Sequence, residues 1–335
     1  MTKVLYLGNK FFKYKKVKSV LETLEPLLAD FCDIRTASDK KNQFLRFLDM
    51  LWYFFKFGGK ADKIIIDVYS TKAFYFAYFF SILSWMFNKK YILFLHGGNL
   101  PFRHEQSKKM VTRMFSKAHK IIAPSGYLKD FFEANRFSVE LVPNIIELEN
   151  YPFKLREKIK PHILALRGFG KPYNPLMTLR AINELKNSIP DLKVLMLGNE
   201  KDFFYNDVIS YIDENHLSNI VTVKPKCTRD EWVDLSKDYD IMVSNPLIDN
   251  TPVSLLEGMA LGMCVISTNV GGVPYLVTNN NCLLVESDDA KGLARSITQG
   301  VKTHKMVNQM SINARKKAEN FSWENIKPMW IKLLK

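Results

Sequence analysis

Short apolar runs alternate with longer segments of helical periodicity through the first half of the chain. The apolar runs occupy residues 3–8, 62–69, 90–98 and 119–125, and helical patterns occupy residues 17–31, 73–87 and 127–135, with a further helical segment that ends at Ala118. Apolar runs of about four to eight residues, separated by helical segments, are typical of parallel strands joined by crossover helices. The pattern therefore predicts a doubly wound parallel α/β sheet.

The same alternation starts again after residue 160. Strands are predicted at residues 162–168, 193–199, 220–226 and 240–246, and helices at residues 176–189, 203–215 and 229–239. A last strand that runs into a linker, around residues 142–160, separates the two series. The chain is therefore predicted to form two α/β domains, residues 1–150 and 151–318, followed by a C-terminal helix in residues 319–335.

The longest apolar run, residues 73–87, is 15 residues long and contains Ser81 and Ser84. A helix that spans a bilayer needs about 20 apolar residues. The run is therefore interpreted as a buried helix. Because it is rich in aromatic residues and is followed by Asn88-Lys89-Lys90, a monotopic or re-entrant membrane segment remains the alternative.

The composition is that of a globular protein with two cores. Of the 335 residues, 47% are hydrophobic, which excludes a disordered or fibrous chain. The cysteines and histidines lack zinc-site spacing, the cysteines form no disulfide pattern, and the first residues lack a signal-peptide pattern. These features predict a cytoplasmic protein with no metal site. The cysteines are Cys32, Cys227, Cys264 and Cys282.

The net charge of +14 is distributed unevenly. Residues 1–150 contain 24 Lys and Arg against 14 Asp and Glu, a difference of +10, and the remainder contains 24 against 20. The segment Lys10–Lys18 interleaves five lysines with Phe11, Phe12 and Tyr14. This mixture suits an anionic membrane surface or a phosphate-rich ligand, and equally a solvated loop. Nucleic acid is the weaker alternative, because no helix-turn-helix, zinc-finger or RNA-binding pattern accompanies the charge.

A dinucleotide-binding site is disfavoured. Such a site needs G-x-G-x-x-G after its first strand, and the first predicted strand is followed by a single glycine, Gly8. Lys10, two residues after Gly8, is a candidate to contact a phosphate group in place of a glycine-rich turn.

Two carboxylates, Asp249 and Glu257, lie on either side of the start of a predicted helix. Pro252 suits the first helical position and Asn250 or Thr251 could cap the helix, so Asp249 precedes it and Glu257 lies about 7.5 Å along it. The helix start, Thr251, Pro252 and Val253, has a dipole and free N–H groups that favour an anion. Ionised carboxylates accept hydrogen bonds from sugar hydroxyls. The layout suits a ligand in which a diphosphate lies between two sugars.

The next predicted strand, residues 263–269, is followed by Gly271 and Gly272. Adjacent glycines allow a ligand to approach the backbone closely. Open α/β sheets bind ligands at the carboxyl ends of their strands. Both glycines are therefore candidate ligand contacts, with a simple turn as the alternative.

The segment from Asp249 to Pro274 resembles the acidic-x7-Glu signature of family 4 retaining glycosyltransferases. An Asp replaces the more usual first Glu, and Tyr275 stands where another Glu often follows. The resemblance implies the GT-B fold, in which two Rossmann-like domains face a cleft. It also implies that residues 151–318 bind a nucleotide-diphosphate sugar as co-substrate without a further cofactor, that residues 1–150 bind the acceptor, and that the last helix crosses back to the first domain.

The resemblance also assigns residues. It implies that Glu257 contacts the ribose and Asp249 the transferred sugar. Arg167 and Lys171, in RGFGK after the first strand of the second domain, are similar to the pair that holds the donor diphosphate, where they would stabilise the charge that develops on the leaving phosphate. His96, followed by Gly97 and Gly98, is similar to the histidine turn near the reacting sugar.

The expected activity is metal-independent, retaining transfer of a hexose-type sugar to an acceptor hydroxyl. The acceptor is expected to be a saccharide or a lipid-linked molecule of polysaccharide or glycolipid synthesis, at the inner face of the membrane. Two alternatives remain. A GT-B epimerase or hydrolase would consume the nucleotide sugar without an acceptor, and a non-catalytic carbohydrate-binding protein would bind it without consuming it.

Overall fold

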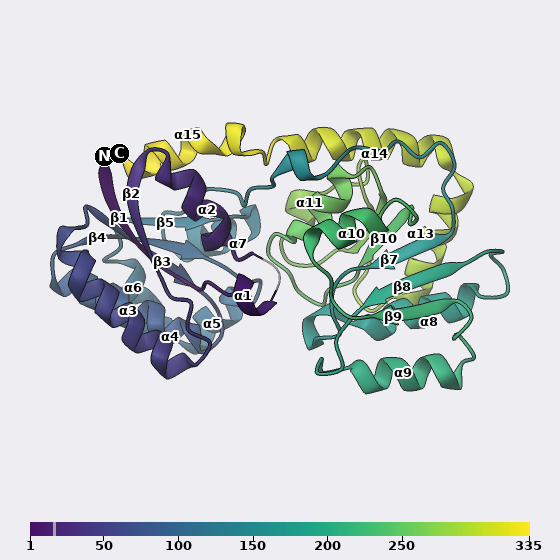
Figure 1. Cartoon of the computed structure of the whole chain (residues 1–335), viewed down its shortest axis with the longest axis horizontal. Helices are drawn as coiled ribbons and strands as arrows, with labels where there is room; N and C mark the ends of the chain where they lie inside the picture. The colour runs from purple at the N-terminus through teal and green to yellow at the C-terminus, as the bar shows by residue number, and fades with distance from the viewer. Residues whose placement is uncertain (16–17) are drawn as a thin grey trace. The chain divides into compact units, whose positions relative to one another are not determined.

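The computed structural model describes residues 1–15 and 18–335, and these residues form two compact domains. The N-terminal domain consists of Met1–Ile145 with Trp323–Lys335, and the C-terminal domain of Ile146–Ser322. These boundaries lie a few residues from the predicted ones. Both domains are α/β units with parallel sheets, as the alternating pattern predicted (Figure 1).

The N-terminal domain is built on a six-stranded parallel sheet in the order β2-β1-β3-β4-β5-β6. The chain adds β2 on one side of β1 and then continues on the other side with β3, so the strand order reverses between β1 and β3. The strands are β1 (Thr2–Leu7), β2 (Cys32–Ala37), β3 (Lys63–Val68), β4 (Lys90–Leu95), β5 (Lys120–Ala123) and β6 (Glu140–Leu141).

Helices cover both faces of this sheet. One face packs against α3, α4, α5, α6 and α7, and the other against α2 and the C-terminal helix α15, whose Trp330 is fully buried. The helices of this domain are α1 (Phe12–Lys15), α2 (Val20–Ala29), α3 (Gln43–Phe57), η1 (Gly58–Lys60), α4 (Ala73–Met86), α5 (Leu100–Gln106), α6 (Lys108–Phe115), α7 (Gly126–Ala134) and α15 (Trp323–Leu334).

Two features of this domain differ from the sequence-based prediction. Residues 32–60 had no assignment, and they form β2, α3 and η1. The prediction that residues 73–87 form a buried helix is correct for one face only. In α4, Phe74, Ala77 and Phe80 are buried, whereas Trp85 and Met86 are exposed. Among the described residues, no helix is both long enough and apolar enough to cross a membrane.

The predicted basic segment Lys10–Lys18 includes Lys16 and Val17, which lie outside the described residues. The ammonium group of Lys10 contacts Glu25 at 2.7 Å and donates to the Thr36 hydroxyl at 3.0 Å. Its charge is therefore paired within the domain, which does not support the suggestion that Lys10 replaces a glycine-rich phosphate loop.

The C-terminal domain repeats the architecture, with the strand order β12-β11-β10-β7-β8-β9. Helices α8, α9 and α13 pack on one face, and α10, α11 and α14 on the other. The strands are β7 (His162–Ala165), β8 (Lys193–Leu197), β9 (Val221–Lys224), β10 (Ile241–Ser244), β11 (Cys264–Thr268) and β12 (Leu283–Val285). The helices are η2 (Leu148–Asn150), η3 (Lys171–Tyr173), α8 (Pro175–Leu185), α9 (Tyr205–Glu214), α10 (Arg229–Leu235), α11 (Val253–Ala260), α12 (Val273–Leu276), α13 (Ala290–Lys302) and α14 (His304–Glu319).

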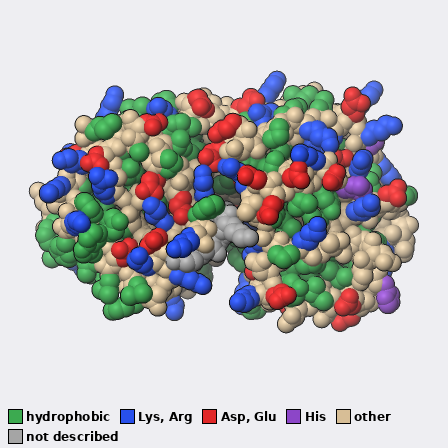
Figure 2. Space-filling view, in the orientation of Figure 1, with side chains coloured by type: hydrophobic (Ala, Val, Ile, Leu, Met, Phe, Trp, Pro, Cys, Tyr) green, Lys and Arg blue, Asp and Glu red, His purple; other side chains and the backbone are tan. Residues whose placement is uncertain are grey.

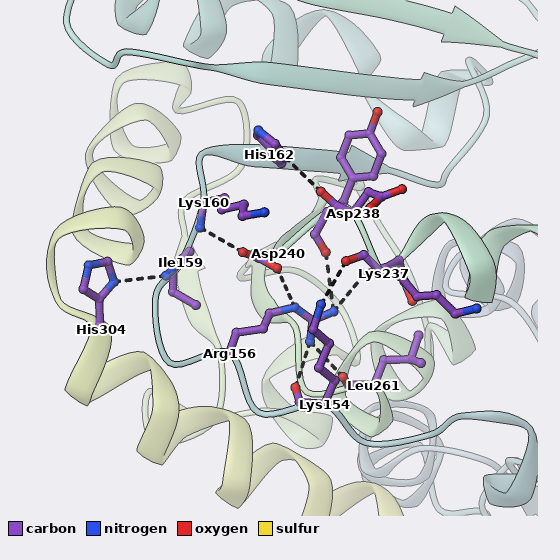
Figure 3. Close-up of polar contacts among 12 residues, drawn as sticks. Lys154, Arg156, Ile159, Lys160, His162, Lys237, Asp238, Asp240, Leu261 and His304 are labelled. Carbon is purple, nitrogen blue, oxygen red and sulfur yellow. Dashed lines mark hydrogen bonds and ion pairs between the residues drawn. The ribbon is translucent and has the colours of Figure 1, made fainter.

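A buried ion pair fixes the segment that leads into β7 (Figure 3). The guanidinium of Arg156 donates to Asp240 at 2.9 Å and to the backbone carbonyls of Leu261 and Ser236, each at 2.9 Å. The second carboxylate oxygen of Asp240 accepts from the backbone N–H of Lys160 at 2.9 Å. Both charges are thus fully hydrogen-bonded, which is the condition for burying them without a large penalty.

Candidate functional site

The predicted site residues of the C-terminal domain gather at the point where its strand order reverses. β7 is paired with β8 on one side and with β10 on the other, and β10 is paired with β11. Arg167 follows β7, Asp249 follows β10, and Gly271 follows β11. Their loops leave the carboxyl ends of three neighbouring strands, which is the usual ligand position in an open α/β sheet.

The loop after β7 is anchored by Phe169. This ring is fully buried against Gly198, where a Cβ atom would approach it to 2.4 Å. The backbone N–H of Phe169 also donates to the carboxylate of Asp202 at 3.0 Å. The fixed loop sets the position of Arg167, two residues earlier.

Arg167 joins the loop after β7 to the loop after β10. Its Nη2 donates to Oδ2 of Asp249 at 2.8 Å, and its Nη1 donates to the hydroxyl of Ser254 at 3.3 Å. The guanidinium stacks over the ring of Tyr173, 4.3 Å from its centroid. The buried Nε atom has no hydrogen-bond partner among the described residues. Arg167 is therefore held by three side chains, and its buried Nε is the one guanidinium nitrogen without a partner among the described residues.

Lys171 is not joined to Arg167 by any contact between the described residues. It is exposed, and its Nζ lies 4.1 Å from the centroid of the Phe203 ring. The closeness of Arg167 and Lys171 in the sequence therefore does not bring their side chains together.

Helix α11 begins one residue later than predicted, at Val253, and Pro252 is its N-cap. Neither Asn250 nor Thr251 is the cap residue. Pro252 has the extended backbone of a cap, with φ −69° and ψ 104°, instead of the helical backbone of a first helical residue. Glu257 lies within the helix, as predicted.

Glu257 is paired with a residue that the sequence analysis did not identify. The hydroxyl of Tyr151 donates to Oε1 of Glu257 at 2.6 Å, and no described residue donates to Oε2. Burial raises the pKa of Glu257 above its ordinary value of 4.5, although the Tyr151 hydrogen bond and the positive charges of Arg167 and Arg229 act in the opposite direction. One oxygen of this carboxylate is thus fixed and the other is available to a hydroxyl group.

Gly271 and Gly272 lie against the loop that carries Asp249. The backbone N–H of Gly272 donates to the carbonyl of Asp249 at 3.0 Å. A Cβ atom on Gly271 would lie 2.2 Å from that carbonyl oxygen, and one on Gly272 would lie 1.6 Å from the carbonyl oxygen of Asn250. Gly271 also has a φ of +53°. The two glycines are therefore required for packing the Asp249 loop, whatever contact they make with a ligand.

In the N-terminal domain, His96 is buried in a polar cluster centred on Asp67. Nε2 of His96 lies 2.9 Å from Oδ1 of Asp67, and the imidazole stacks on Tyr69 with ring centroids 4.9 Å apart. The hydroxyl of Tyr6 also donates to Asp67, at 2.8 Å. Burial, followed by the charge of Asp67, raises the pKa of Tyr6 well above its ordinary value. Asp67 therefore sets the orientation of His96.

The two glycines after His96 shape the turn that follows β4. Gly97 has a φ of +85°, a left-handed conformation that favours glycine. The carbonyl of Gly98 accepts a hydrogen bond from the hydroxyl of Tyr127 at 3.2 Å.

A cavity of about 400 Å³ lies in the same domain, with Asn9, Arg46, Tyr69 and Lys72 among the residues of its wall.

Sequence reasoning missed Asp67, Tyr151 and Ser254. Asp67 stands at the carboxyl end of a predicted strand, and Ser254 stands in the first turn of a predicted helix, so both positions carried a usable signal. Tyr151 is 106 residues from its partner Glu257, and nothing local indicates the pairing.

Comparison with known proteins identifies the family. Residues 149–317, half of the chain, match the model of the family described as Glycosyl transferases group 1. The chain belongs to this glycosyltransferase family. The family match contains Tyr151, Arg167, Asp249, Glu257 and both glycines.

Two curated relatives illustrate the similarity. An uncharacterized glycosyltransferase of Methanocaldococcus jannaschii is 24% identical over 245 residues, which cover 70% of this chain and 65% of the relative. The D-inositol 3-phosphate glycosyltransferase of Paenarthrobacter aurescens is 22% identical over 250 residues, which cover 69% and 60%. The matched segment thus spans less than two thirds of the length of each relative.

A solved structure shares the fold over both domains. The Anabaena protein HepE in complex with UDP-glucose is similar with a TM-score of 0.77 and 13% identity, over 100% of this chain and 99% of that chain. The two-domain α/β fold predicted from the alternating pattern is confirmed.

Proposed function

We propose that this group 1 glycosyltransferase transfers a hexose-type sugar from a nucleotide-diphosphate sugar to an acceptor hydroxyl, with retention at the anomeric carbon. The observation that carries the proposal is the Arg167–Asp249 pair beside Ser254, with Glu257 further along α11. It is supported by the family match, by the D-inositol 3-phosphate glycosyltransferase relative and by the UDP-glucose that the Anabaena structure contains.

Each group of the donor has a matching partner in this arrangement. The diphosphate lies at the N-terminus of α11, where backbone N–H groups and the helix dipole favour an anion. Arg167 contacts it through the Nη2 and Nη1 groups that now hold Asp249 and Ser254. Asp249, once released, accepts from hydroxyls of the transferred sugar, and Oε2 of Glu257 accepts from the ribose.

Charge stabilisation follows from the same placement. When the bond between sugar and phosphate breaks, negative charge develops on the leaving diphosphate, and fixed cations and dipoles stabilise it. Arg167 and the α11 N-terminus supply this stabilisation without a metal ion, and Lys171 contributes after it leaves the Phe203 ring. The departing phosphate then takes the acceptor proton, so no protein base is required.

The acceptor is proposed to bind in the N-terminal domain, in the cavity beside Tyr69. This cavity has the cations Arg46 and Lys72 and the rings of Phe11 and Phe76 in its wall. Such a lining suits a saccharide or a lipid-linked acceptor that carries a phosphate. His96, fixed by Asp67, acts as a positioning residue for the turn at Gly97 and Gly98.

A thermal-shift screen with UDP-, GDP- and ADP-sugars tests donor binding on the full chain. A specific donor at a hundredfold excess over its Kd stabilises the folded state by about 2.7 kcal/mol. Glu257→Ala should abolish the shift, whereas Glu184→Ala, an exposed glutamate on α8, should leave it unchanged. If no nucleotide sugar shifts the unfolding temperature, the proposed donor site is wrong.

Product analysis separates transfer from its alternatives. With a bound donor, a transferase releases the nucleoside diphosphate in proportion to glycosylated acceptor. Consumption of the donor at the same rate without an acceptor would indicate a hydrolase or an epimerase. Binding without consumption in the presence of a panel of phosphorylated acceptors would indicate a non-catalytic protein.

A further inference from the structure

The outer face of α3 exposes a row of large apolar side chains. Phe44, Leu45, Leu48, Trp52 and Phe55 are between 43% and 68% exposed. Phe44 precedes Leu48 by four residues, and Leu45, Leu48, Trp52 and Phe55 follow one another at intervals of three or four. These intervals place the row on one side of the helix, opposite the buried Met50 and Phe54. Single exposed apolar residues are ordinary on protein surfaces, but a continuous row of this size usually marks an interaction surface.

Helix α4 extends the same surface. It exposes Tyr75, Phe79, Trp85 and Met86, and the residue that follows, Phe87, is also exposed. Aromatic rings join the two helices. The ring centroids of Phe47 and Phe79 are 4.9 Å apart, and those of Phe55 and Phe87 are 6.0 Å apart. We call this surface, formed by Phe44, Leu45, Leu48, Trp52, Phe55, Tyr75, Phe79, Trp85, Met86 and Phe87, the aromatic face. Figure 2 shows hydrophobic side chains on this side of the N-terminal domain, with lysines, arginines and some acidic side chains beside them.

Cations border the aromatic face. Nζ of Lys56 lies 4.2 Å from the ring centroid of Trp52, and Nζ of Lys117 lies 5.4 Å from that of Trp85. Along α3 and α4 the only acidic side chain is Asp49, and it accepts a hydrogen bond from Ser38. Lys56 also lines an open hollow of about 580 Å³ with Leu48, Leu51, Trp52 and Phe55. Apolar rings at the centre and ammonium groups at the edge are suited to the boundary between lipid and water.

The whole net charge of the chain belongs to the domain that carries this face. The N-terminal domain contains 27 Lys and Arg against 13 Asp and Glu, a difference of +14, whereas the C-terminal domain contains 21 of each. An anionic surface is therefore attracted to the aromatic face, and the attraction is screened by salt.

These observations point to one occupant. We propose that the aromatic face inserts its side chains into the interfacial region of a bilayer that contains anionic lipid. The helices would lie in the plane of the membrane surface, since α4 has 14 residues and is too short to cross a bilayer. The proposal concerns where the protein acts and does not depend on the donor assignment in the C-terminal domain.

Two other occupants fit less well. A second copy would bring two net charges of +14 together, which opposes association. An acidic protein partner would need directional polar contacts, and α4 offers no charged side chain for them. A lipid interface needs only apolar area and cations at its edge.

Sedimentation of the full chain with vesicles tests the proposal. Vesicles of phosphatidylcholine mixed with phosphatidylglycerol should bind the protein, and pure phosphatidylcholine vesicles should bind it more weakly. The double variant Trp52→Gln, Phe55→Gln should lower the partition coefficient by at least about tenfold, because two aromatic side chains no longer transfer from water. High salt should weaken the binding of both proteins.

Met329→Gln is the matched control. Met329 belongs to the same domain and is 42% exposed, but α15 packs on the opposite face of the sheet. This variant should bind vesicles as the wild type does. Far-UV circular dichroism and the thermal shift with a nucleotide sugar show that each variant is folded, and the latter result reports on the donor site separately.

Tryptophan fluorescence gives a second readout. Trp52 and Trp85, two of the five tryptophans, lie on the aromatic face, so their emission should move to shorter wavelength and be quenched by brominated lipid. No binding to anionic vesicles, or equal binding by the double variant and the wild type, would overturn the proposal. So would a dimer in sedimentation equilibrium that the double variant converts to a monomer in the absence of vesicle binding, since a second copy would then occupy the face.

Discussion

The hydroxyl of Tyr151 and the carboxylate of Glu257 form a hydrogen bond of 2.6 Å that connects the first residues of the C-terminal domain to helix α11. Burial raises the pKa of both groups, and the positive charges of Arg167 and Arg229 lower that of Glu257 in part. A buried acidic group costs stability when it ionises, so the stability of the chain should fall as the pH rises through the raised pKa of Glu257.

Glu257→Gln should remove one component of the pH dependence of stability. The folded-state pKa of Glu257 is raised above 4.5, so the folded state binds the proton more tightly than the unfolded state. The protonated Glu257 side chain contributes fully to the unfolding free energy below pH 4.5, and this contribution is lost as the pH rises through the raised pKa. The difference in unfolding free energy between variant and wild type should therefore grow in favour of the variant as pH rises from 4.5 to 8. Urea unfolding at several pH values measures it, and parallel curves would contradict the assignment.

Tyr151→Phe should shift the pH dependence of donor binding. The Tyr151 hydrogen bond lowers the pKa of Glu257, so its removal raises that pKa further. In the proposed function the donor ribose binds the ionised carboxylate, so donor binding should be lost at a higher pH than in the wild type while the affinity at pH 9 changes little. Titration calorimetry with the donor from pH 5 to 9 measures the midpoint. An unchanged midpoint would mean that the hydrogen bond has no influence on the carboxylate when the donor is bound.

Arg167→Lys should lower kcat/KM by about 10²- to 10³-fold, the range seen when one preorganised donor to a developing charge is removed. A lysine has one ammonium group and cannot contact Asp249 and Ser254 through separate nitrogens, as the guanidinium does. Steady-state kinetics with the donor found in the screen measures the effect. Arg180→Lys, at an exposed ion pair with Asp288 in the same domain, is the control and should stay within about twofold. Equal losses in both variants would show that Arg167 has no special role.

Asp67→Asn should destabilise the N-terminal domain by about 1–3 kcal/mol, the cost of leaving a buried donor without an acceptor. The Asp67 carboxylate accepts hydrogen bonds from Tyr6 and Tyr69 and contacts His96, and these contacts use both of its oxygens. The amide of an asparagine has only one oxygen. Denaturant unfolding measures the change, with Asp33→Asn at a half-exposed carboxylate as the control. If His96 positions the acceptor turn, KM for the acceptor should rise while donor affinity stays constant, which a purely structural effect would not separate.

The gathering of Arg167 and Asp249 at one edge of the sheet could be predicted from sequence because both residues follow strands with clear apolar patterns. Arg167 and Asp249 come after β7 and β10, and parallel pairing of these strands brings their loops together. The pattern did not determine details that depend on tertiary packing. Lys171 stacks on Phe203, and the packing of Gly271 and Gly272 against the Asp249 loop has no signature in the sequence.

Helix α4 was interpreted as fully buried for a physical reason. Apolar residues occupy both its buried and its exposed faces, as Phe80 and Met86 illustrate, so no amphipathic period marks the exposed face. Helix α3 was missed although its sequence is amphipathic. A surface that binds an apolar partner cannot be distinguished from a core by hydrophobicity alone, because both replace water around the same side chains.

Arg156→Met tests the ion pair that fixes the segment before β7. The substitution removes the partner of the buried Asp240 carboxylate and also leaves the carbonyls of Ser236 and Leu261 without the guanidinium, so we expect a loss of about 3–5 kcal/mol in unfolding free energy. Arg180→Met, which breaks the exposed pair with Asp288, should cost about 1 kcal/mol or less. The double variant Arg156→Met, Asp240→Asn should recover part of the loss, since it no longer buries an unpaired charge. A double variant whose loss equals the sum of the losses of Arg156→Met and Asp240→Asn alone would show that the guanidinium acts through its carbonyl contacts and not through the charge of Asp240.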